Sequence, residues 1–322
     1  MRKLLWLLAL VPALISTPGW AQYPNKPVRV VVPFAPGGAS DFVGRILQPR
    51  MSELLGQQVV VENRAGASGN IGMEAAAKSA PDGYTLYLGN VGTVALNPAV
   101  FPKLGTVPTR DFIAVSQVVD VPGVLVVNPE LQARTVKEVI DIAKAYPGKL
   151  NYGSPGAGSQ NRLETEVFRK VAGNLDMVHV PYKGGAGPAV AGLVGGETHL
   201  MFVTASSAMN HVKNGRLRLI AVTSAKRLEA FPDAPTMAEA GYPDLTSGSW
   251  QGIFVPTGTP PAVVDKLYGV IIETMKTAEV RQRLANGGVD VVTSAPGEFA
   301  KFVAKETDRW GKAVKEAGAT AE

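Results

Sequence analysis

One arrangement recurs along this chain and limits the folds it can adopt: a short apolar run, a glycine-rich loop and the start of an amphipathic segment. The first example begins with Val28–Val32, a β-branched run typical of a strand that is buried on both faces. Gly37 and Gly38 follow, and Ser40 or Asp41 is the expected N-cap of a helix. Such a loop leaves backbone N–H groups unpaired at the helix start, where they can bind a carboxylate or another anion.

Further units of the same kind follow. Apolar strands are expected at 58–62, 85–88, 123–127, 177–181, 199–203, 217–223 and 250–255. Helices are expected at 73–79, 135–145, 160–172, from 188, at 263–277 and at 296–317, with Thr135 and Glu138 as a capping box. Loops rich in small, hydroxyl or amide residues follow several strands, at 63–72, 89–93, 153–159, 182–187 and 204–207.

These units fall into two sets, one over 28–93 and the other over 123–207. Ligands of open α/β sheets bind at the carboxyl ends of strands, where these loops are expected. A single glycine loop can be explained as a tight turn. Several such loops, all at the carboxyl ends of strands, favour a ligand-binding site instead. The sequence therefore predicts two α/β lobes whose glycine loops face each other across a cleft.

The first 21 residues have the pattern of a secretory signal peptide. Arg2-Lys3 is a charged start, an apolar run covers 4–15, and Gly19-Trp20-Ala21 provides small residues for cleavage. We expect cleavage after Ala21 and, in a Gram-negative cell, export to the periplasm. An uncleaved anchor is the alternative, which the short apolar run disfavours. Loss of the two basic residues lowers the net charge from +5 to +3.

Composition and motifs exclude several classes of function. The chain has no cysteine, which rules out disulfides and thiolate metal sites. Its charges are scattered without a basic block, so no nucleic-acid partner is expected. The histidines, His179, His199 and His211, lack the spacing of metal ligands, and His179 is interpreted as structural. No nucleophile, nucleotide or convincing dinucleotide motif occurs, so we expect no catalytic residue, no metal and no cofactor.

Several segments together resemble one protein family. They are YPxKPVRVVVPFxPGGxSD at 23–41, VENRAGAxGNIG at 61–72, PDGYTL at 81–86, LNYGSxGxGS at 150–159, VPYKG at 180–184, AVTS at 221–224, PTxxEAGYP at 235–243 and WxG at 250–252. The chain is similar in these segments to Bug-type (TctC-like) receptors, the extracytoplasmic solute-binding proteins of tripartite tricarboxylate transporters. The resemblance covers essentially all of the chain after the leader.

The resemblance implies an α/β, two-lobed periplasmic binding protein of type II, a Venus flytrap with two crossover strands near 120–123 and 247–251. It implies lobe 1 at residues 22–121 plus 249–322 and lobe 2 at residues 122–248. Such receptors close around a small carboxylate that is bound by main-chain groups and ordered water rather than by a strong cation, and we expect a monomer.

By position, the resemblance also assigns ligand-binding residues. On the first lobe they are Phe34, Pro36, Gly37, Gly38, Ser40, Asp41, Ala67, Ser68, Gly69, Asn90 and Thr93. On the second lobe they are Ser154, Gly156, Gly158, Ser159, Tyr182, Lys183, Gly184, Gly185, Ala186, Val203 and Thr204. Asp41 is either a contact for a ligand amino group or only a helix cap. Lys183 is either a contact for a second carboxylate or an exposed residue at the rim.

The expected function is capture of a small organic acid, a mono- or dicarboxylate, and its delivery to the membrane permease subunits of the transporter. Aromatic and amino acids are included as ligand classes. Val203 replaces a frequent Asp or Ser of the family, which suggests a ligand less polar than an amino dicarboxylate if this residue lines the cleft. Two alternatives stay open: presentation of the ligand to a signalling sensor, and an exported enzyme built on scattered Asp and Glu residues.

Overall fold

The computed structural model describes residues 23–101, 103–156 and 158–317. The leader predicted over residues 1–21, with its cleavage point, lies outside the described residues. The strands are β1 (Val28–Val32), β2 (Val59–Asn63), β3 (Thr85–Asn90), β4 (Phe112–Val127), β5 (Leu150–Ser154), β6 (Met177–Pro181), β7 (Leu200–Thr204), β8 (Arg218–Val222), β9 (Gly248–Pro256) and β10 (Asp290–Val291).

The helices, with three short helical turns labelled η, connect these strands. They are α1 (Ala39–Leu55), η1 (Ala67–Gly69), α2 (Asn70–Ala77), η2 (Gly92–Leu96), α3 (Asn97–Val100), α4 (Pro108–Asp111), α5 (Val136–Ala145), α6 (Gln160–Val171), α7 (Ala186–Val194), α8 (Ala205–Lys213), η3 (Pro243–Leu245), α9 (Pro261–Lys276), α10 (Ala278–Asn286) and α11 (Pro296–Ala317). No helix in this part of the chain is long and apolar enough to span a membrane.

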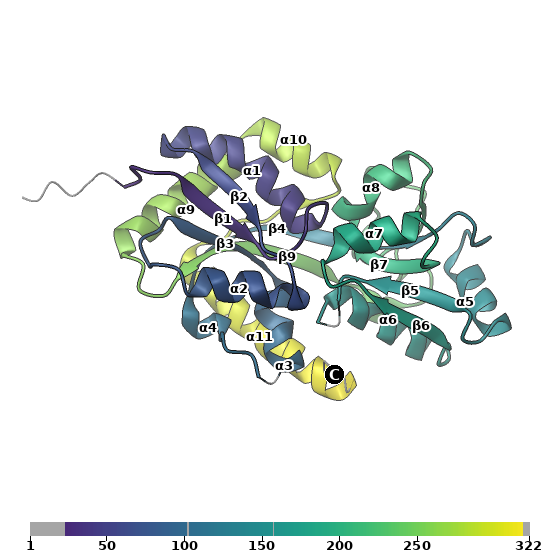
Figure 1. The fold of residues 1–322 in the computed structure, drawn as a ribbon. Helices are drawn as coiled ribbons and strands as arrows, with labels where there is room; N and C mark the ends of the chain where they lie inside the picture. The colour runs from purple at the N-terminus through teal and green to yellow at the C-terminus, as the bar shows by residue number, and fades with distance from the viewer. Residues whose placement is uncertain (1–22, 102, 157, 318–322) are drawn as a thin grey trace, which may run out of the picture.

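The strands form one curled sheet in the order β2-β1-β3-β9-β4-β7-β5-β6, with β8 and β10 as further partners of β4. Strand β4 belongs to both halves. From Phe112 to Pro122 it pairs antiparallel with β9, and from Gly123 to Val127 it pairs with β7 and β8. Figure 1 shows the two halves side by side, with β4 and β9 between them. We call the half with β1, β2, β3, β9 and β10 lobe 1 and the half with β5, β6, β7 and β8 lobe 2.

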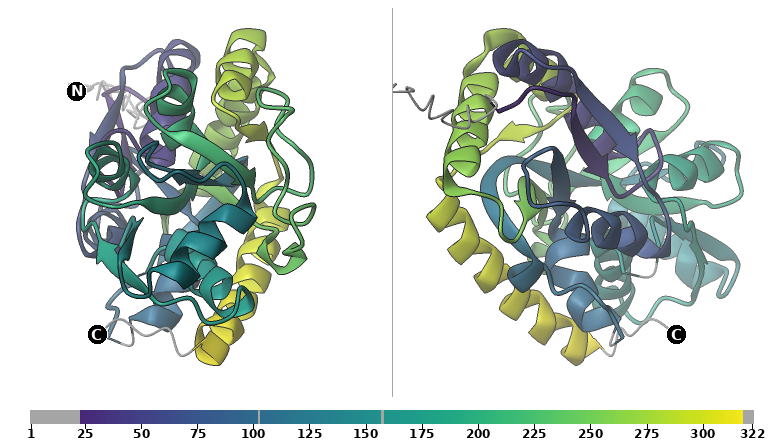
Figure 2. Two further views of the ribbon diagram at one scale, coloured as in Figure 1. Left: turned by 90° about the vertical axis from the view of Figure 1, so that its right-hand side faces the viewer. Right: turned by 60° about the vertical axis from the view of Figure 1, so that its left-hand side comes forward.

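Helices cover both faces of the sheet in lobe 1. Helices α1, α9 and α10 pack on one face, and α2, α3 and α11 pack on the other (Figures 1 and 2). Val28, Val30 and Val32 of β1 belong to the core of the first face, and Val31 belongs to the core of the second. The β-branched run of β1 is therefore buried on both faces, as the sequence predicts.

Lobe 2 has the same layered arrangement. Helices α5 and α6 pack against one face of its sheet, and α7 and α8 pack against the other. The predicted capping box at the start of α5 is confirmed: the Thr135 hydroxyl accepts from the Glu138 N–H, and the Glu138 carboxylate accepts from the Thr135 N–H.

Several elements differ from the sequence-based expectation. The strand expected at 123–127 is only the end of β4, because Ser116, Gln117 and Asp120 interrupt the apolar pattern of its first part. The loop expected at 204–207 is the start of α8, with Thr204 as its N-cap. Helix α10 was not expected, since its sequence is largely polar.

The predicted cap of α1 at Ser40 or Asp41 is wrong. The N-cap is Gly38, whose backbone is extended, and both predicted residues lie inside the first turn of the helix. The carboxylate of Asp41 instead accepts a hydrogen bond of 3.1 Å from the N–H of Gly37, one residue before the cap. The side chain therefore fixes the glycine loop rather than the free N–H groups of the first turn.

A glycine on β9 sets how closely the sheet and α11 approach each other. A Cβ at Gly252 would lie 2.9 Å from the carbonyl oxygen of Ser116 and still closer to the ring of Phe299. We expect Gly252→Ala to lower the free energy of unfolding by about 1–3 kcal/mol through overpacking. Urea denaturation followed by circular dichroism measures this change.

Gly269 provides the matched control, because a Cβ there, on an exposed position of α9, would contact nothing. Gly269→Ala should raise the free energy of unfolding by about 0.5–1 kcal/mol, as alanine is the better helix former. Equal effects of the two substitutions would contradict the packing described for β9 and α11.

Candidate functional site

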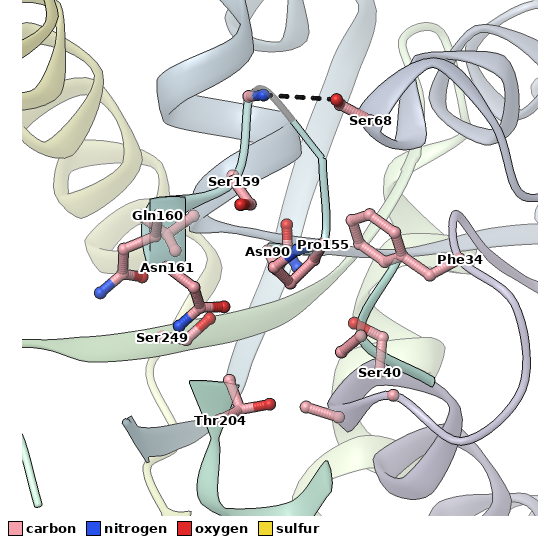
Figure 3. Close-up of a pocket in the computed structure, with 16 residues that line it drawn as sticks. Phe34, Ser40, Ser68, Asn90, Pro155, Ser159, Gln160, Asn161, Thr204 and Ser249 are labelled. Atoms are coloured by element: carbon pink, nitrogen blue, oxygen red, sulfur yellow. Dashed lines mark hydrogen bonds between the residues drawn. The ribbon is translucent and has the colours of Figure 1, made fainter. Parts of the chain in front are cut away.

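A cavity lies between the two lobes, where several strands end (Figure 3). Phe34 follows β1, Asn90 ends β3, Pro155 follows β5 and Thr204 ends β7, and all four line it. The cavity has a volume of about 50 Å³, room for a few water molecules or a small organic molecule. The lining residues are Phe34, Gly38, Ala39, Ser40, Ser68, Asn90, Val91, Gly92, Pro155, Gly158, Ser159, Gln160, Asn161, Ala186, Thr204 and Ser249.

The structure brings together part of the predicted ligand-binding set. The predicted residues that line the cavity are Phe34, Gly38, Ser40, Ser68, Asn90, Gly158, Ser159, Ala186 and Thr204. The predicted residues that do not line it are Pro36, Gly37, Asp41, Ala67, Gly69, Thr93, Ser154, Gly156, Tyr182, Lys183, Gly184, Gly185 and Val203. Most of the predicted residues that do not line the cavity lie in the same loops as those that do, one or two residues away in the sequence.

Sequence reasoning missed several lining residues, namely Ala39, Val91, Gly92, Pro155, Gln160, Asn161 and Ser249. Most are direct neighbours of predicted residues. Gln160 and Asn161 follow Ser159, the N-cap of α6. Recognising Ser159 as a cap would have added the first turn of α6 to the predicted binding residues. Ser249 had no such signal, because it reaches the cavity only through the crossing of β9 between the lobes.

Asp41 is buried and turned into its own loop. Its carboxylate accepts hydrogen bonds from Arg45 Nε at 2.9 Å, Asn63 Nδ2 at 3.0 Å and the Gly37 N–H. Burial raises the pKa of Asp41, but these hydrogen bonds and the charge of Arg45 outweigh burial and hold the pKa below its usual value. With its oxygens engaged in this way, Asp41 supports the loop and does not face the cavity.

Three other predicted contacts do not line the cavity. Lys183 is exposed, and the hydroxyl of Tyr182 donates to Glu197 at 2.7 Å. Val203 is fully buried in the core between the sheet of lobe 2 and helices α7 and α8. Because Val203 does not line the cavity, its identity gives no information on ligand polarity.

The glycine loops of the two lobes contact each other. The N–H of Ala35 donates to the carbonyl oxygen of Gly184 at 2.9 Å, and the N–H of Gly158 donates to Ser68 Oγ at 3.3 Å. A Cβ at Gly187 would overlap the carbonyl oxygen of Pro36 across the same gap. These contacts join the first-lobe loops to the second-lobe loops, so the structure is a closed form.

The side chains that line the cavity are all uncharged. Helix N-termini surround the cavity instead, because the first residues of α1, α6 and α7 and the N-cap of α8 line it. Unpaired N–H groups and the helix dipole make these ends favourable for an anion. Within the described residues no group of His, Asp and Glu side chains is arranged to bind a metal ion.

His179 supports the cavity from behind. Its ring stacks on Tyr152 with the ring centres 4.9 Å apart, and its Nε2 lies 2.7 Å from the Ser154 hydroxyl, next to Pro155. The interpretation of His179 as structural agrees with these contacts. Burial, followed by the charges of Arg162 and Arg169, lowers the pKa of His179 to about 4.

We therefore expect His179 to stay neutral well below pH 6.5. Between pH 6.5 and about 4 the unfolded chain binds this proton and the folded chain does not, so stability should fall as the pH decreases through that interval. NMR titration of the imidazole protons should give a midpoint near pH 4, and His179→Phe should remove this part of the pH dependence. A midpoint near 6.5 would contradict the buried, stacked geometry.

Comparisons with known proteins agree on one family. The model of the tripartite tricarboxylate transporter family receptor matches residues 43–319. Protein BugT of Bordetella pertussis is 38% identical over 97% of this chain and 98% of its own length. The solved periplasmic binding protein BugD is 32% identical with a TM-score of 0.89, covering 93% of this chain and 100% of its own. Rpa4515 of R. palustris, solved with adipate, is 34% identical with a TM-score of 0.89, covering 92% of this chain and 99% of its own.

These neighbours share the two-lobed periplasmic binding fold that the sequence predicts. They are binding proteins and not enzymes, in agreement with the expected function class. The chain therefore belongs to the receptor family of the tripartite tricarboxylate transporters, as a Bug-type, TctC-like solute-binding protein.

Proposed function

We propose that this protein captures a small organic carboxylate in the periplasm and delivers it to the permease subunits of a tripartite tricarboxylate-type transporter. The observation that carries the proposal is a cavity with uncharged side chains and several helix N-termini, enclosed between two lobes in contact. An anion fits such a site, because the N–H groups are already oriented and need no counter-charge. The structural neighbour solved with adipate supports the carboxylate class.

The two lobes are proposed to close around the ligand. Lobe 1 would comprise 22–121 plus 249–322 and lobe 2 would comprise 122–248, with the ligand stabilising the closed form by its contacts to both lobes. The predicted residues that line the cavity, from Phe34 to Thr204, are the proposed ligand contacts. The leader would direct a monomer to the periplasm.

Ligand binding is tested by native mass spectrometry of the purified protein and by calorimetry with mono-, di- and tricarboxylates of two to eight carbons. We expect a co-purified acid, or at least one carboxylate that binds one to one with a micromolar or tighter Kd. A micromolar Kd corresponds to a binding free energy of about −8 kcal/mol. Uptake of that acid should be lost in a strain lacking the protein. Binding of a neutral or cationic solute with no response to any carboxylate would overturn the proposal.

Closure is tested separately at Gly187, on the second residue of α7. Gly187→Ala places a methyl group against the carbonyl oxygen of Pro36 only when the lobes are closed. The affinity for the tightest acid of the panel should fall at least about tenfold, a cost of about 1.4 kcal/mol. The melting temperature without ligand should not fall, because the open form has room for the methyl group and alanine is the better helix former.

The matched control is Gly311→Ala, at a glycine of α11 where a Cβ would contact nothing. This substitution should leave the affinity unchanged. Wild-type affinity in Gly187→Ala would show that the bound form is more open than this structure.

A further inference from the structure

A buried carboxylate fixes the orientation of two amide side chains at the start of α6. Glu164 is only 5% exposed, and three neutral side chains donate to it: Ser247 Oγ, Gln160 Nε2 at 2.9 Å and Asn161 Nδ2 at 3.0 Å. Burial raises the pKa of Glu164, and the hydrogen bonds from Ser247, Asn161 and Gln160 oppose that rise. In its ionised form the carboxylate only accepts hydrogen bonds, so the nitrogen of each amide faces Glu164. Gln160 Nε2 also donates to the carbonyl oxygen of Gly248 at 3.2 Å.

The carbonyl oxygen of Asn161 consequently faces away from Glu164. Asn161 lines the cavity, and Figure 3 shows it beside Ser249 on the side formed by α6. No described residue donates a hydrogen bond to Asn161 Oδ1. The neighbouring Gln160 Oε1 is likewise buried without a partner among the described residues. This side of the cavity therefore presents an unused hydrogen-bond acceptor.

The cavity residue Asn90, from lobe 1, offers the reverse polarity. Asn90 Oδ1 accepts from the N–H of Thr93 at 3.0 Å and from the Thr93 hydroxyl at 3.2 Å. This leaves Asn90 Nδ2 as the free half of the amide, and Asn90 lines the cavity. Lobe 1 thus presents a donor that suits a carboxylate oxygen, and lobe 2 presents an acceptor that a carboxylate cannot satisfy.

We propose that Asn161, oriented by Glu164, selects ligands that carry a hydroxyl group in addition to a carboxylate. The inference rests on the proposed function and narrows it to hydroxy acids. An acid without a donor would leave Asn161 Oδ1 desolvated and unpaired in the closed cavity, which is costly. A hydroxyl fits better than an ammonium group, because the cavity has no anionic side chain to match a positive charge.

The test is calorimetry with acid pairs that differ by one hydroxyl: propionate and lactate, succinate and malate, glutarate and 2-hydroxyglutarate. We expect at least one hydroxy acid to bind about tenfold or more tightly than its partner. In Asn161→Leu, which has a similar volume and no acceptor, the two affinities should agree within about twofold. Asn210→Leu, at an exposed asparagine of α8, should keep the wild-type ratio.

A second variant, Glu164→Gln, gives the same readout if Asn161→Leu does not fold. An amide at position 164 can donate to Asn161 Oδ1, so the side-chain amide of Asn161 is free to rotate by half a turn. The affinity ratio between a hydroxy acid and its partner acid should then shrink toward one. Equal binding within every pair by the wild-type protein would overturn the hydroxyl preference and leave the proposed carboxylate function intact. If both variants keep the wild-type ratio of affinities within a pair, the proposed role of Asn161 is also overturned. Tighter binding of aspartate than of malate would overturn it as well. No binding of any acid would remove the proposed function as well.

Discussion

The antiparallel pair of β4 and β9 is the structural connection on which the arrangement of the two lobes depends. Strand β4 pairs with β9 up to Pro122 and continues from Gly123 into the sheet of lobe 2. At this point Thr223 Oγ1 accepts from the N–H of Gly123 at 3.0 Å and donates to the carbonyl oxygen of Ser247 at 3.0 Å. One hydroxyl thereby joins both crossing segments.

The cavity follows from this connection, because it brings the carboxyl ends of strands from two sheets opposite each other. Each of these ends leads into a helix, so the N-termini of α1, α6, α7 and α8 converge without any charged side chain. The carboxylate of Asp41, beside the first of these loops, is engaged with Arg45 and not with the cavity. A site of this kind relies on backbone groups for charge and on a few amide and hydroxyl side chains for selectivity.

Local patterns predicted the elements that are stabilised locally. The β1 run, the glycine loop after it and the Thr135–Glu138 capping box follow from residues close in sequence, and part of the cavity lining in such loops was predicted with them. The first part of β4 was not, because its polar residues interrupt the apolar pattern, and one of them is paired far away in the sequence: the Ser116 hydroxyl donates to the carbonyl oxygen of Ser294. The orientation of Asn161 depends in the same way on Glu164 and, through it, on Ser247.

The most direct measurement of the central claim is a crystal structure of the protein with its bound acid. We expect carboxylate oxygens within hydrogen-bond distance of backbone N–H groups in the first turns of α1, α6 or α8, with Ala35 and Gly184 still in contact. A carboxylate paired with Lys183 or with an arginine, or an acid bound outside the cavity between the lobes, would contradict it.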